Sequence, residues 1–302
     1  MKLRLLSLAL LLPLQSYAET LEIATFNVEW FGSPYTNPRS TNPTPTPSDW
    51  LIKRTQIFKD FVKQEFRPKD IAIFEEVVDV DLLKSTLPDG WTCTSYHNPN
   101  PVHQKVVACV SRQYTLSKVQ HDDNFQIEEV ATDADWSRPA LRLDVKNKKG
   151  KILLRVVGVH LKSGPAFSQE RIRQTNAIAD DLYIGGNQIP IVVLGDMNTF
   201  FSTDTGMNYD DIDKITETLS DYSGSKFRDI AFKEAYTYRK GRYKSKFDHI
   251  IVNDKVKSYT TPEVFEVCNS DNQIQKENPY LNLDFYNQYI SDHCFVKTNI
   301  KI

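Results

Sequence analysis

Short apolar runs, rich in Val, Ile and Leu, alternate with polar segments from Leu21 onward and predict a series of β-strands. The clearest runs are residues 21–28, 71–74, 106–111, 140–145, 152–160, 189–194, 247–252 and 294–298. Apolar residues recur at helical spacing over residues 50–66, with Ser48 or Asp49 as N-cap, and over residues 168–183. Helices between strand runs indicate an α/β protein with one mixed sheet, or with two sheets sandwiched by helices.

The proline-rich residues 33–47 separate the first strand run from the first helix. Each proline removes a backbone donor and biases the preceding residue away from helix, so we expect a surface loop. No internal repeat or linker divides the rest of the chain. We therefore expect a single domain over residues 19–302.

The first residues of the chain have the pattern of a secretory signal peptide. Lys2 and Arg4 precede an apolar run at residues 5–14, and small residues stand at Ser16 and Ala18. This pattern predicts a signal peptide of residues 1–18, removed in the mature protein. An uncleaved membrane anchor is the alternative, but about ten apolar residues are too few to span hydrocarbon about 30 Å thick. We therefore expect a secreted or periplasmic protein without stable membrane association.

The composition, with 40% hydrophobic and 25% charged residues, is that of an ordinary globular protein and excludes collagen-like and disordered chains. The formal net charge is −2, and loss of Lys2 and Arg4 with the signal peptide makes it −4. A globally basic surface is therefore excluded. Attraction for a polyanion would have to come from a local basic patch or from bound metal.

The four cysteines of an exported protein would lie in an oxidising compartment, where pairing is expected. Cys93 and Cys109 lie symmetrically about the turn sequence at residues 98–101, so we predict a disulfide across a hairpin. Cys268 and Cys294 remain as a possible second pair. Free, buried cysteines are the alternative.

Acid, amide and histidine residues cluster at or near the ends of the strand runs. They include Asn27, Glu75 and Glu76, His160, Asp196 and Asn198, Asp248, and Asp292 and His293. Any one cluster alone is compatible with a capped strand end or a polar turn. In this order, with Gly-Asp-x-Asn at residues 195–198 and Ser-Asp-His at residues 291–293, the chain resembles the endonuclease/exonuclease/phosphatase superfamily. The resemblance runs from Leu21 to about Thr298.

The resemblance implies a four-layer αββα sandwich, in which helices flank two mixed sheets as in pancreatic deoxyribonuclease and apurinic-site endonucleases. It also implies an enzyme that hydrolyses phosphate esters with activated water and a divalent cation. Such a reaction needs a group that takes the proton of water, and positive charge at the phosphate oxygens. Hard oxygen ligands suit Mg²⁺ or Mn²⁺, with Ca²⁺ as a further possibility.

The same resemblance suggests a role for each residue near the metal. Glu76 matches the metal-binding glutamate, Asp292 a further acid near the metal, and Asn27 an amide that orders metal and phosphate. Glu75 stands where relatives often have glutamine. Because adjacent strand residues face opposite sides, we do not expect Glu75 and Glu76 to bind the same ion.

The remaining matched residues are expected to act on phosphate and water. His293 would contact the scissile phosphate, as general base or as a charged holding group, with Asp248 on its far ring nitrogen. Asp196 would position or deprotonate the water, and Asn198 would hold the phosphate or the attacking species. His160 matches a phosphate ligand or an acid toward the leaving oxygen.

Some residues depart from the family pattern. Gln104 stands near the position where some nuclease relatives carry a phosphate-binding tyrosine, which puts that contact in doubt. Three further histidines have no assigned family role and are expected to be ordinary residues: His97, His103 and His249.

A basic run at residues 239–246 precedes Asp248 and is expected to form a hairpin at the rim of the site. Its Arg239, Lys240 and Arg242 are candidates for binding a phosphate backbone, although a solvated hairpin is the alternative. Two further candidates for substrate binding are Arg138 and Lys162.

The leading functional hypothesis is an exported nuclease that cuts DNA, with RNA as a further substrate. One alternative is a phospholipid or sphingomyelin phosphodiesterase, or a sugar- or inositol-phosphate phosphatase. A lipid enzyme would need an exposed apolar segment, and at residues 279–286 we expect a loop with core-facing aromatic residues instead. The second alternative, a non-catalytic binding module, is disfavoured because the chain retains every group that the reaction needs.

Overall fold

The computed structural model of the chain describes residues 19–35, 44–96, 103–119, 124–131, 138–184, 188–230, 236–270 and 278–302. The predicted signal peptide lies outside these residues, as do His97, the turn at residues 98–101 and part of the predicted loop at residues 33–47. No helix among the described residues is long and apolar enough to cross a membrane.

Two seven-stranded sheets form the centre of the described fold. The first sheet has the order β14-β16-β1-β2-β4-β3, with β15 paired to β16. In it, β1 runs parallel to β2 and antiparallel to β16. Its strands are β1 (Thr20–Phe31), β2 (Ile71–Val77), β3 (Thr92–Ser95), β4 (Lys105–Val110), β14 (Ser258–Tyr259), β15 (Glu263–Val264) and β16 (Val296–Lys301).

The second sheet has the order β10-β13-β9-β8-β7-β5, with β6 paired to β7. Its parallel pair is β8 and β9. Its strands are β5 (Tyr114–Ser117), β6 (Gln126–Ile127), β7 (Ala140–Asn147), β8 (Ile152–His160), β9 (Ile191–Asp196), β10 (Phe227–Asp229) and β13 (Asp248–Asn253). A separate hairpin consists of β11 (Tyr238–Lys240) and β12 (Tyr243–Ser245).

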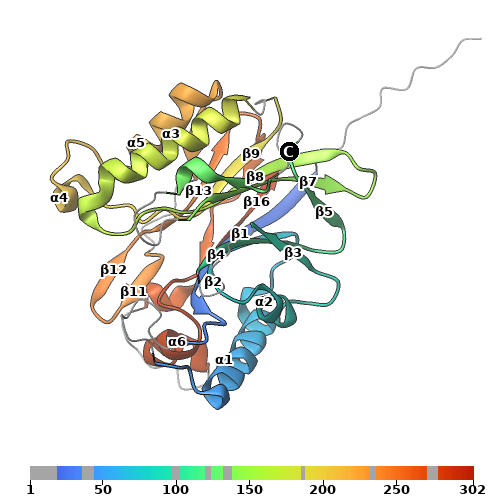
Figure 1. Cartoon of the computed structure of the whole chain (residues 1–302), viewed down its shortest axis with the longest axis vertical. Helices are drawn as coiled ribbons and strands as arrows, with labels where there is room; N and C mark the ends of the chain where they lie inside the picture. The colour runs from blue at the N-terminus through green and yellow to red at the C-terminus, as the bar shows by residue number, and fades with distance from the viewer. Residues whose placement is uncertain are drawn as a thin grey trace, which may run out of the picture.

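Helices cover the outer face of each sheet, so the fold has the four αββα layers that the sequence predicted (Figure 1). The first sheet is covered by α1 (Ser48–Phe61), α2 (Val80–Thr86) and α6 (Leu283–Tyr289), and the second by α3 (Ser168–Ile184) and α5 (Asp211–Ser223). Shorter helical turns are α4 (Ser202–Thr205), Glu128–Val130, Pro165–Phe167, Glu266–Cys268 and Pro279–Leu281.

The central strands are apolar on both faces because each is buried on both faces. In β1, Leu21 and Ile23 pack between the two sheets, whereas Ala24 and Phe26 pack under the helices. Successive strand residues point to opposite faces, so a strand between two layers needs apolar residues at nearly every position. This explains why the strands are continuous apolar runs in the sequence.

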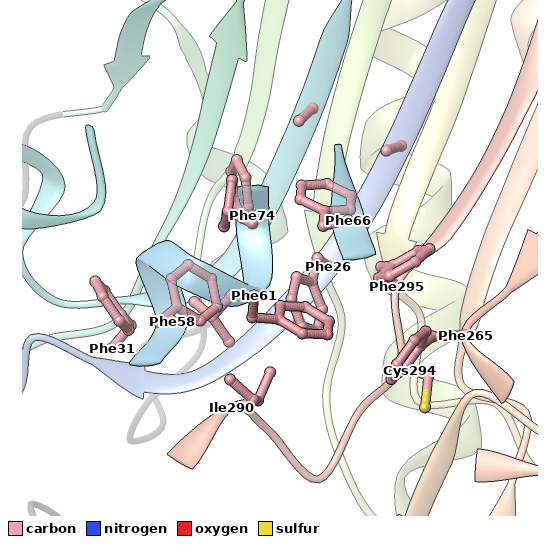
Figure 2. Packing of buried hydrophobic residues seen from close by; sticks show 14 of the residues in the cluster. Phe26, Phe31, Phe58, Phe61, Phe66, Phe74, Phe265, Ile290, Cys294 and Phe295 are labelled. Carbon is pink, nitrogen blue, oxygen red and sulfur yellow. The ribbon is translucent and has the colours of Figure 1, made fainter. Parts of the chain in front are cut away.

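Aromatic rings fill the layer between the first sheet and its helices. Phe26 of β1 lies with its ring centroid 6.0 Å from those of Phe58 and Phe61 and 5.6 Å from that of Phe66. Figure 2 shows these rings gathered beneath the strand. Such pairs contribute about 0.5–1.5 kcal/mol each beyond their buried area. The packing of these rings therefore stabilises the position of β1 against α1.

The first helix differs from its prediction at both ends. It begins at Ser48 with Pro47 in the N-cap position and no side-chain cap, so neither Ser48 nor Asp49 is the N-cap. From Val62 it continues as a π-helix to Phe66. In an α-helix, residues five apart lie about 140° apart around the axis. The wider π-turn instead brings Phe61 and Phe66 onto the same Phe26 ring.

Residues 279–286 fall in two short helical segments, Pro279–Leu281 and α6, rather than in the predicted loop, but their aromatic side chains face the core as expected. Tyr280 and Tyr286 are buried, and both rings lie within 6 Å of the Phe61 ring. This segment therefore presents no apolar probe to a lipid surface.

The predicted Cys93–Cys109 disulfide is present, and the possible second pair, Cys268 and Cys294, is also bonded. Cys93 and Cys109 join the neighbouring strands β3 and β4, with their Cα atoms 4.1 Å apart. Cys268 and Cys294 have Cα atoms 6.2 Å apart. Because Cys294 follows His293 directly, the second disulfide anchors the Ser-Asp-His segment to residues 266–268.

Candidate active site

Acid, amide and imidazole side chains from both sheets meet in one cavity of about 440 Å³. Its polar lining consists of Glu29, Glu76, His160, Ser163, Asp196, Asn198, Lys240, Asp292 and His293. Glu76 lies on β2 of the first sheet, and His293 lies just before β16 of the same sheet. His160 and Asp196 lie on β8 and β9 of the second sheet. The cavity therefore lies where the two sheets meet.

Strand register places three of the key residues in one row across the second sheet. His160 of β8 is paired with Asp196 of β9, and Asp196 is paired with Asp248 of β13. Directly paired residues point to the same side of a sheet, about 5 Å apart. Gly195 permits this register, because a Cβ there would lie 2.0 Å from the carbonyl oxygen of Val159.

The first sheet bends as it reaches the cavity. The β1–β2 pairing shifts register between Asn27 and Phe31, and Glu76 has a positive φ of 59°. Of the five non-glycine residues with positive φ in the described chain, four line the cavity: Glu29, Trp30, Glu76 and Asn198. Such conformations cost about 1–3 kcal/mol each and typically cluster at functional sites.

The bend gives the adjacent residues Glu75 and Glu76 separate environments, as the sequence predicted. Glu75 is fully buried and accepts a hydrogen bond of 2.7 Å from Thr25 Oγ1. Burial raises the pKa of Glu75 well above its usual value. Glu76 instead lines the cavity, so only Glu76 of the two is placed to bind an ion there.

Glu76, His160 and Asp196 form one cluster, with ligand atoms within 4.8 Å of one another. His160 Nε2 lies 3.4 Å from Asp196 Oδ2 and 3.6 Å from Glu76 Oε1. Asn27 Nδ2 donates to Asp196 Oδ2 at 2.9 Å and lies 3.4 Å from Glu76 Oε1. The backbone N–H of Asn198 donates to Asp196 Oδ1 at 3.0 Å. Asn27 and Asn198 thus fix the orientation of the carboxylates.

Asp196, Asp248 and His293 form the second cluster. The structure has the expected contact between Asp248 and His293, with 2.8 Å between Oδ2 and Nδ1. His293 Nε2 then lies 3.7 Å from Asp196 Oδ2. Burial opposes the charge on His293, but attraction by Asp248 and Asp196 outweighs it and raises the pKa of the imidazole well above its usual value. His293 is therefore held as an imidazolium between two acids.

The Asp196 carboxylate is the point that the two clusters share. Burial, helped by the nearby charges of Asp248 and Glu76, raises the pKa of Asp196 to about 7, while His293 and Asn27 act in the opposite direction. A carboxylate with this pKa exchanges its proton near neutral pH, as a general base requires.

The donor set fits a hard divalent cation. Two carboxylates, Glu76 and Asp196, face each other across a few ångströms, and Mg²⁺ is usually held by one or two carboxylates and several waters. Asp292 lines the same cavity but belongs to neither of the two clusters found among the described residues. Asn27 presents Nδ2 to the carboxylates and accepts from the Glu29 N–H with Oδ1. Asn27 therefore orients the carboxylates around the candidate cation site through its amide nitrogen.

A lysine and two further acids form the rim of the cavity. Lys240 Nζ lies 3.2 Å from Asp292 Oδ2 and 3.6 Å from Glu29 Oε1. Burial and then the charge of Asp292 raise the pKa of Glu29 to about 7. Lys240 is thus the predicted substrate-binding residue that the structure brings into the cavity.

The prediction for Arg239 is wrong. Strand alternation in β11 turns Tyr238 and Lys240 toward the cavity and Arg239 away from it. Arg239 is buried, and its guanidinium donates to the carbonyl oxygens of Val267, at 3.2 Å, and Ser270. It stabilises the turn next to the second disulfide.

The other predicted substrate-binding residues have different outcomes. Arg242 is exposed in the β11–β12 turn, as predicted. Lys162 lies beside the site, but its Nζ is 5.0 Å above the Phe167 ring, and the cavity lining runs through residues 163–165 instead. Arg138 is buried, lies outside the lining and donates to Gln104 Oε1 at 2.9 Å, so it is not placed to meet substrate.

Several lining residues were missed in the sequence. Five aromatic side chains also line the cavity: Trp30, Phe200, Tyr238, Tyr243 and Phe247. Tyr238 packs its ring edge against His293, with centroids 4.9 Å apart. The available signal was that Tyr238 and Tyr243 flank the basic residues at positions 239, 240 and 242. Gln104 was also missed as a site residue, since its amide nitrogen donates to Glu76 Oε2.

His249, to which no role was assigned, packs away from the cavity. Its Nε2 lies 2.8 Å from Thr199 Oγ1, and its Nδ1 lies 3.3 Å from Asp229 Oδ2. This second acid–histidine pair links the start of β13 to β10. It provides a matched comparison for the Asp248–His293 pair.

Acids and histidines that converge between the sheets of a four-layer sandwich are the arrangement expected of a metal-dependent phosphoric ester hydrolase. The chain belongs to the endonuclease/exonuclease/phosphatase family, whose model matches residues 24–293. This membership confirms the family that the sequence motifs predicted. No curated protein sequence matches the chain.

Solved structures share the fold at low sequence identity. Truncated TDP2 from Caenorhabditis elegans is 14% identical with a TM-score of 0.59, covering 94% of this chain and 98% of that chain. D. rerio TDP2 complexed with single strand DNA product is 13% identical with a TM-score of 0.60, covering 94% and 99%. A family member from Bacteroides vulgatus is 19% identical with a TM-score of 0.60, covering 94% and 99%. These likenesses confirm the predicted fold.

The Asp248–His293 pair gives a direct test of the site. We expect Asp248→Asn to lower the rate of metal-dependent phosphodiester hydrolysis on the order of 10²–10⁴-fold, because the imidazolium loses the charge that holds it. The pKa of His293, followed by NMR, should fall in the same variant. Asp229→Asn disturbs the comparable pair with His249 outside the cavity and should keep most of the activity. Equal losses in both variants would contradict this assignment.

Proposed function

We propose that the protein is an exported, Mg²⁺- or Mn²⁺-dependent nuclease that hydrolyses DNA, with RNA as a further substrate. The observation that carries this proposal is one cavity that holds two facing carboxylates, Glu76 and Asp196, beside the Asp248–His293 pair. A lysine from a basic hairpin stands at its rim. This set supplies a cation site, a proton acceptor and positive charge for a phosphodiester.

Each residue has a chemical task in this proposal. The bound divalent cation would polarise the phosphate and offset its charge in the transition state. Asp196, oriented by Asn27 and by the Asn198 N–H, positions the attacking water and takes its proton. His293 Nε2, held charged by Asp248, donates to a non-bridging phosphate oxygen. His160, on the second sheet, would give a proton to the leaving oxygen as its bond to phosphorus breaks, and Asn198 would hold the phosphate.

The rim of the cavity favours a polynucleotide over a lipid. Lys240 and Arg242 lie on the β11–β12 hairpin with Tyr243, whose side chain is 51% exposed. Cations beside an exposed aromatic ring suit a phosphate backbone with unstacked bases. Residues 279–286, where a lipid enzyme could have carried an exposed apolar segment, pack their aromatic rings against the core. A sugar- or inositol-phosphate phosphatase is the remaining alternative.

A substrate panel tests the proposal and its alternatives together. We expect the purified chain to nick supercoiled plasmid DNA with Mg²⁺ or Mn²⁺, to lose activity in EDTA, and to regain it on metal addition. RNA, sphingomyelin, inositol phosphates and Ca²⁺ complete the panel. Activity confined to the lipid or to phosphomonoesters would overturn the nuclease proposal, and activity unaffected by EDTA would overturn the metal requirement.

The basic hairpin can be tested through the salt dependence of DNA binding. Each neutralised phosphate contributes about −0.9 to the slope of log K against log salt. We expect the double variant Lys240→Gln/Arg242→Gln to weaken binding and to flatten the slope by about 2. Lys148→Gln/Lys149→Gln, which removes two exposed lysines from the β7–β8 turn at the other end of β8, is the matched control. Identical slopes for both variants would mean that the hairpin is only a solvated surface.

Export is a separate part of the proposal. It is supported by the signal-peptide pattern of residues 1–18 and by the two disulfides, which persist mainly in oxidising compartments. We expect mass spectrometry of protein recovered from the periplasm or medium of a bacterial host to give Glu19 as the first residue. Protein that retains Met1 and stays in the cytoplasm would contradict export without affecting the proposed chemistry.

A further inference from the structure

We propose that Gln104 and Arg138 form a two-residue relay that positions the Glu76 carboxylate for a divalent cation. The inference rests on the metal-binding role of Glu76 in the proposed function. It assigns a task to Gln104, which stands near the position where some relatives carry a phosphate-binding tyrosine. It also replaces direct substrate contact as the role of Arg138.

The first link of the relay is the hydrogen bond from Gln104 Nε2 to Glu76 Oε2. Asn27 Nδ2 lies on the other carboxylate oxygen, 3.4 Å from Oε1. The carboxylate therefore has one amide donor on each oxygen. Each carboxylate oxygen has two lone-pair sites, so both oxygens keep acceptor capacity for a cation.

The second link fixes the orientation of the Gln104 amide. Arg138 Nη1 donates to Gln104 Oε1 at 2.9 Å. A guanidinium only donates, whereas a glutamine amide presents an oxygen on one side and a donor nitrogen on the other. With its oxygen bound to Arg138, Gln104 must present its nitrogen to Glu76.

Burial strengthens both links. The exposed fractions are 1% for Gln104 and 6% for Arg138, and hydrogen bonds shielded from water are electrostatically stronger. Gln104 directly precedes β4 of the first sheet, whereas Arg138 precedes β7 of the second. The relay thus ties Glu76 to the opposite sheet, the one that supplies Asp196.

Glu76 needs such support because of where it lies. Its backbone has a positive φ at a register shift of β2, and its side chain is 14% exposed at the cavity. A long side chain on an irregular strand end has rotamer freedom to lose when it binds an ion. Partners that orient a metal ligand typically change metal affinity by about 10–100-fold.

Mn²⁺ affinity, measured by calorimetry on the full chain without substrate, tests the relay. We expect Gln104→Met to weaken Mn²⁺ binding about tenfold, and Arg138→Leu to weaken it by a smaller factor. Because Arg138 acts through Gln104, the double variant should be no weaker than Gln104→Met alone. Gln104→Asn keeps the amide but shortens the side chain by one methylene, and it should also weaken Mn²⁺ binding. It replaces Gln104→Met in the test if that variant fails to fold.

Two reference variants make the outcome specific. Asn253→Leu removes another buried amide with backbone partners, at the far end of β13, and should lose stability while keeping wild-type Mn²⁺ affinity. Glu76→Gln should weaken Mn²⁺ binding more than any relay variant. If Glu76→Gln leaves affinity unchanged, the proposed metal role of Glu76 fails and the relay fails with it.

Other results would overturn the relay alone. It is wrong if Glu76→Gln weakens Mn²⁺ binding but Gln104→Met does not. It is also wrong if the effect of Arg138→Leu adds in full to that of Gln104→Met. A rise in KM with unchanged Mn²⁺ affinity in Arg138→Leu would return Arg138 to direct phosphate binding.

Discussion

Three carboxylates, Glu76, Asp196 and Asp248, lie close together in a largely buried site, and the surrounding structure depends on offsetting their repulsion. His293 lies between Asp248 and Asp196, and Asn27 between Asp196 and Glu76. Buried charges are tolerated only where donors and counter-charges meet them. The same donors leave Glu76 and Asp196 facing each other, an arrangement that suits a hard cation.

The fold supplies the rigidity that this arrangement requires. Asn27 is held between Phe26 and Val28, whose side chains belong to the aromatic layer under α1. The positive-φ backbone conformations of Glu76 and Asn198 cost free energy. Such conformations persist only where the surrounding packing leaves the backbone no alternative. The second disulfide, one residue beyond His293, anchors the remaining segment. The two sheets can therefore meet at a cavity without losing their register.

Strand alternation in one short hairpin decides which cations reach the rim of the cavity. Lys240 faces the cavity, while its neighbour Arg239 turns into the protein and binds backbone carbonyls. Arg138, equally basic, is buried behind Gln104. A chain with a net charge near zero can thus still attract a polyanionic substrate. Few cations are needed for that attraction if they lie beside the reactive phosphate.

The sequence alone determined most of the strand runs, the Cys93–Cys109 disulfide and the motifs that meet in the cavity, because apolar runs, cysteine spacing about a turn and Gly-Asp-x-Asn are local patterns. The αββα layers followed only from the family resemblance of those motifs, and the pairing of Cys268 with Cys294 was decided by the tertiary structure. The sequence did not reveal the π-turn after Phe61, the inward face of Arg239 or the bond from Gln104 to Glu76. Each of these depends on which residue lies opposite in space. Asn27 and Asp196, 169 residues apart, are brought into contact only by the packing of two sheets.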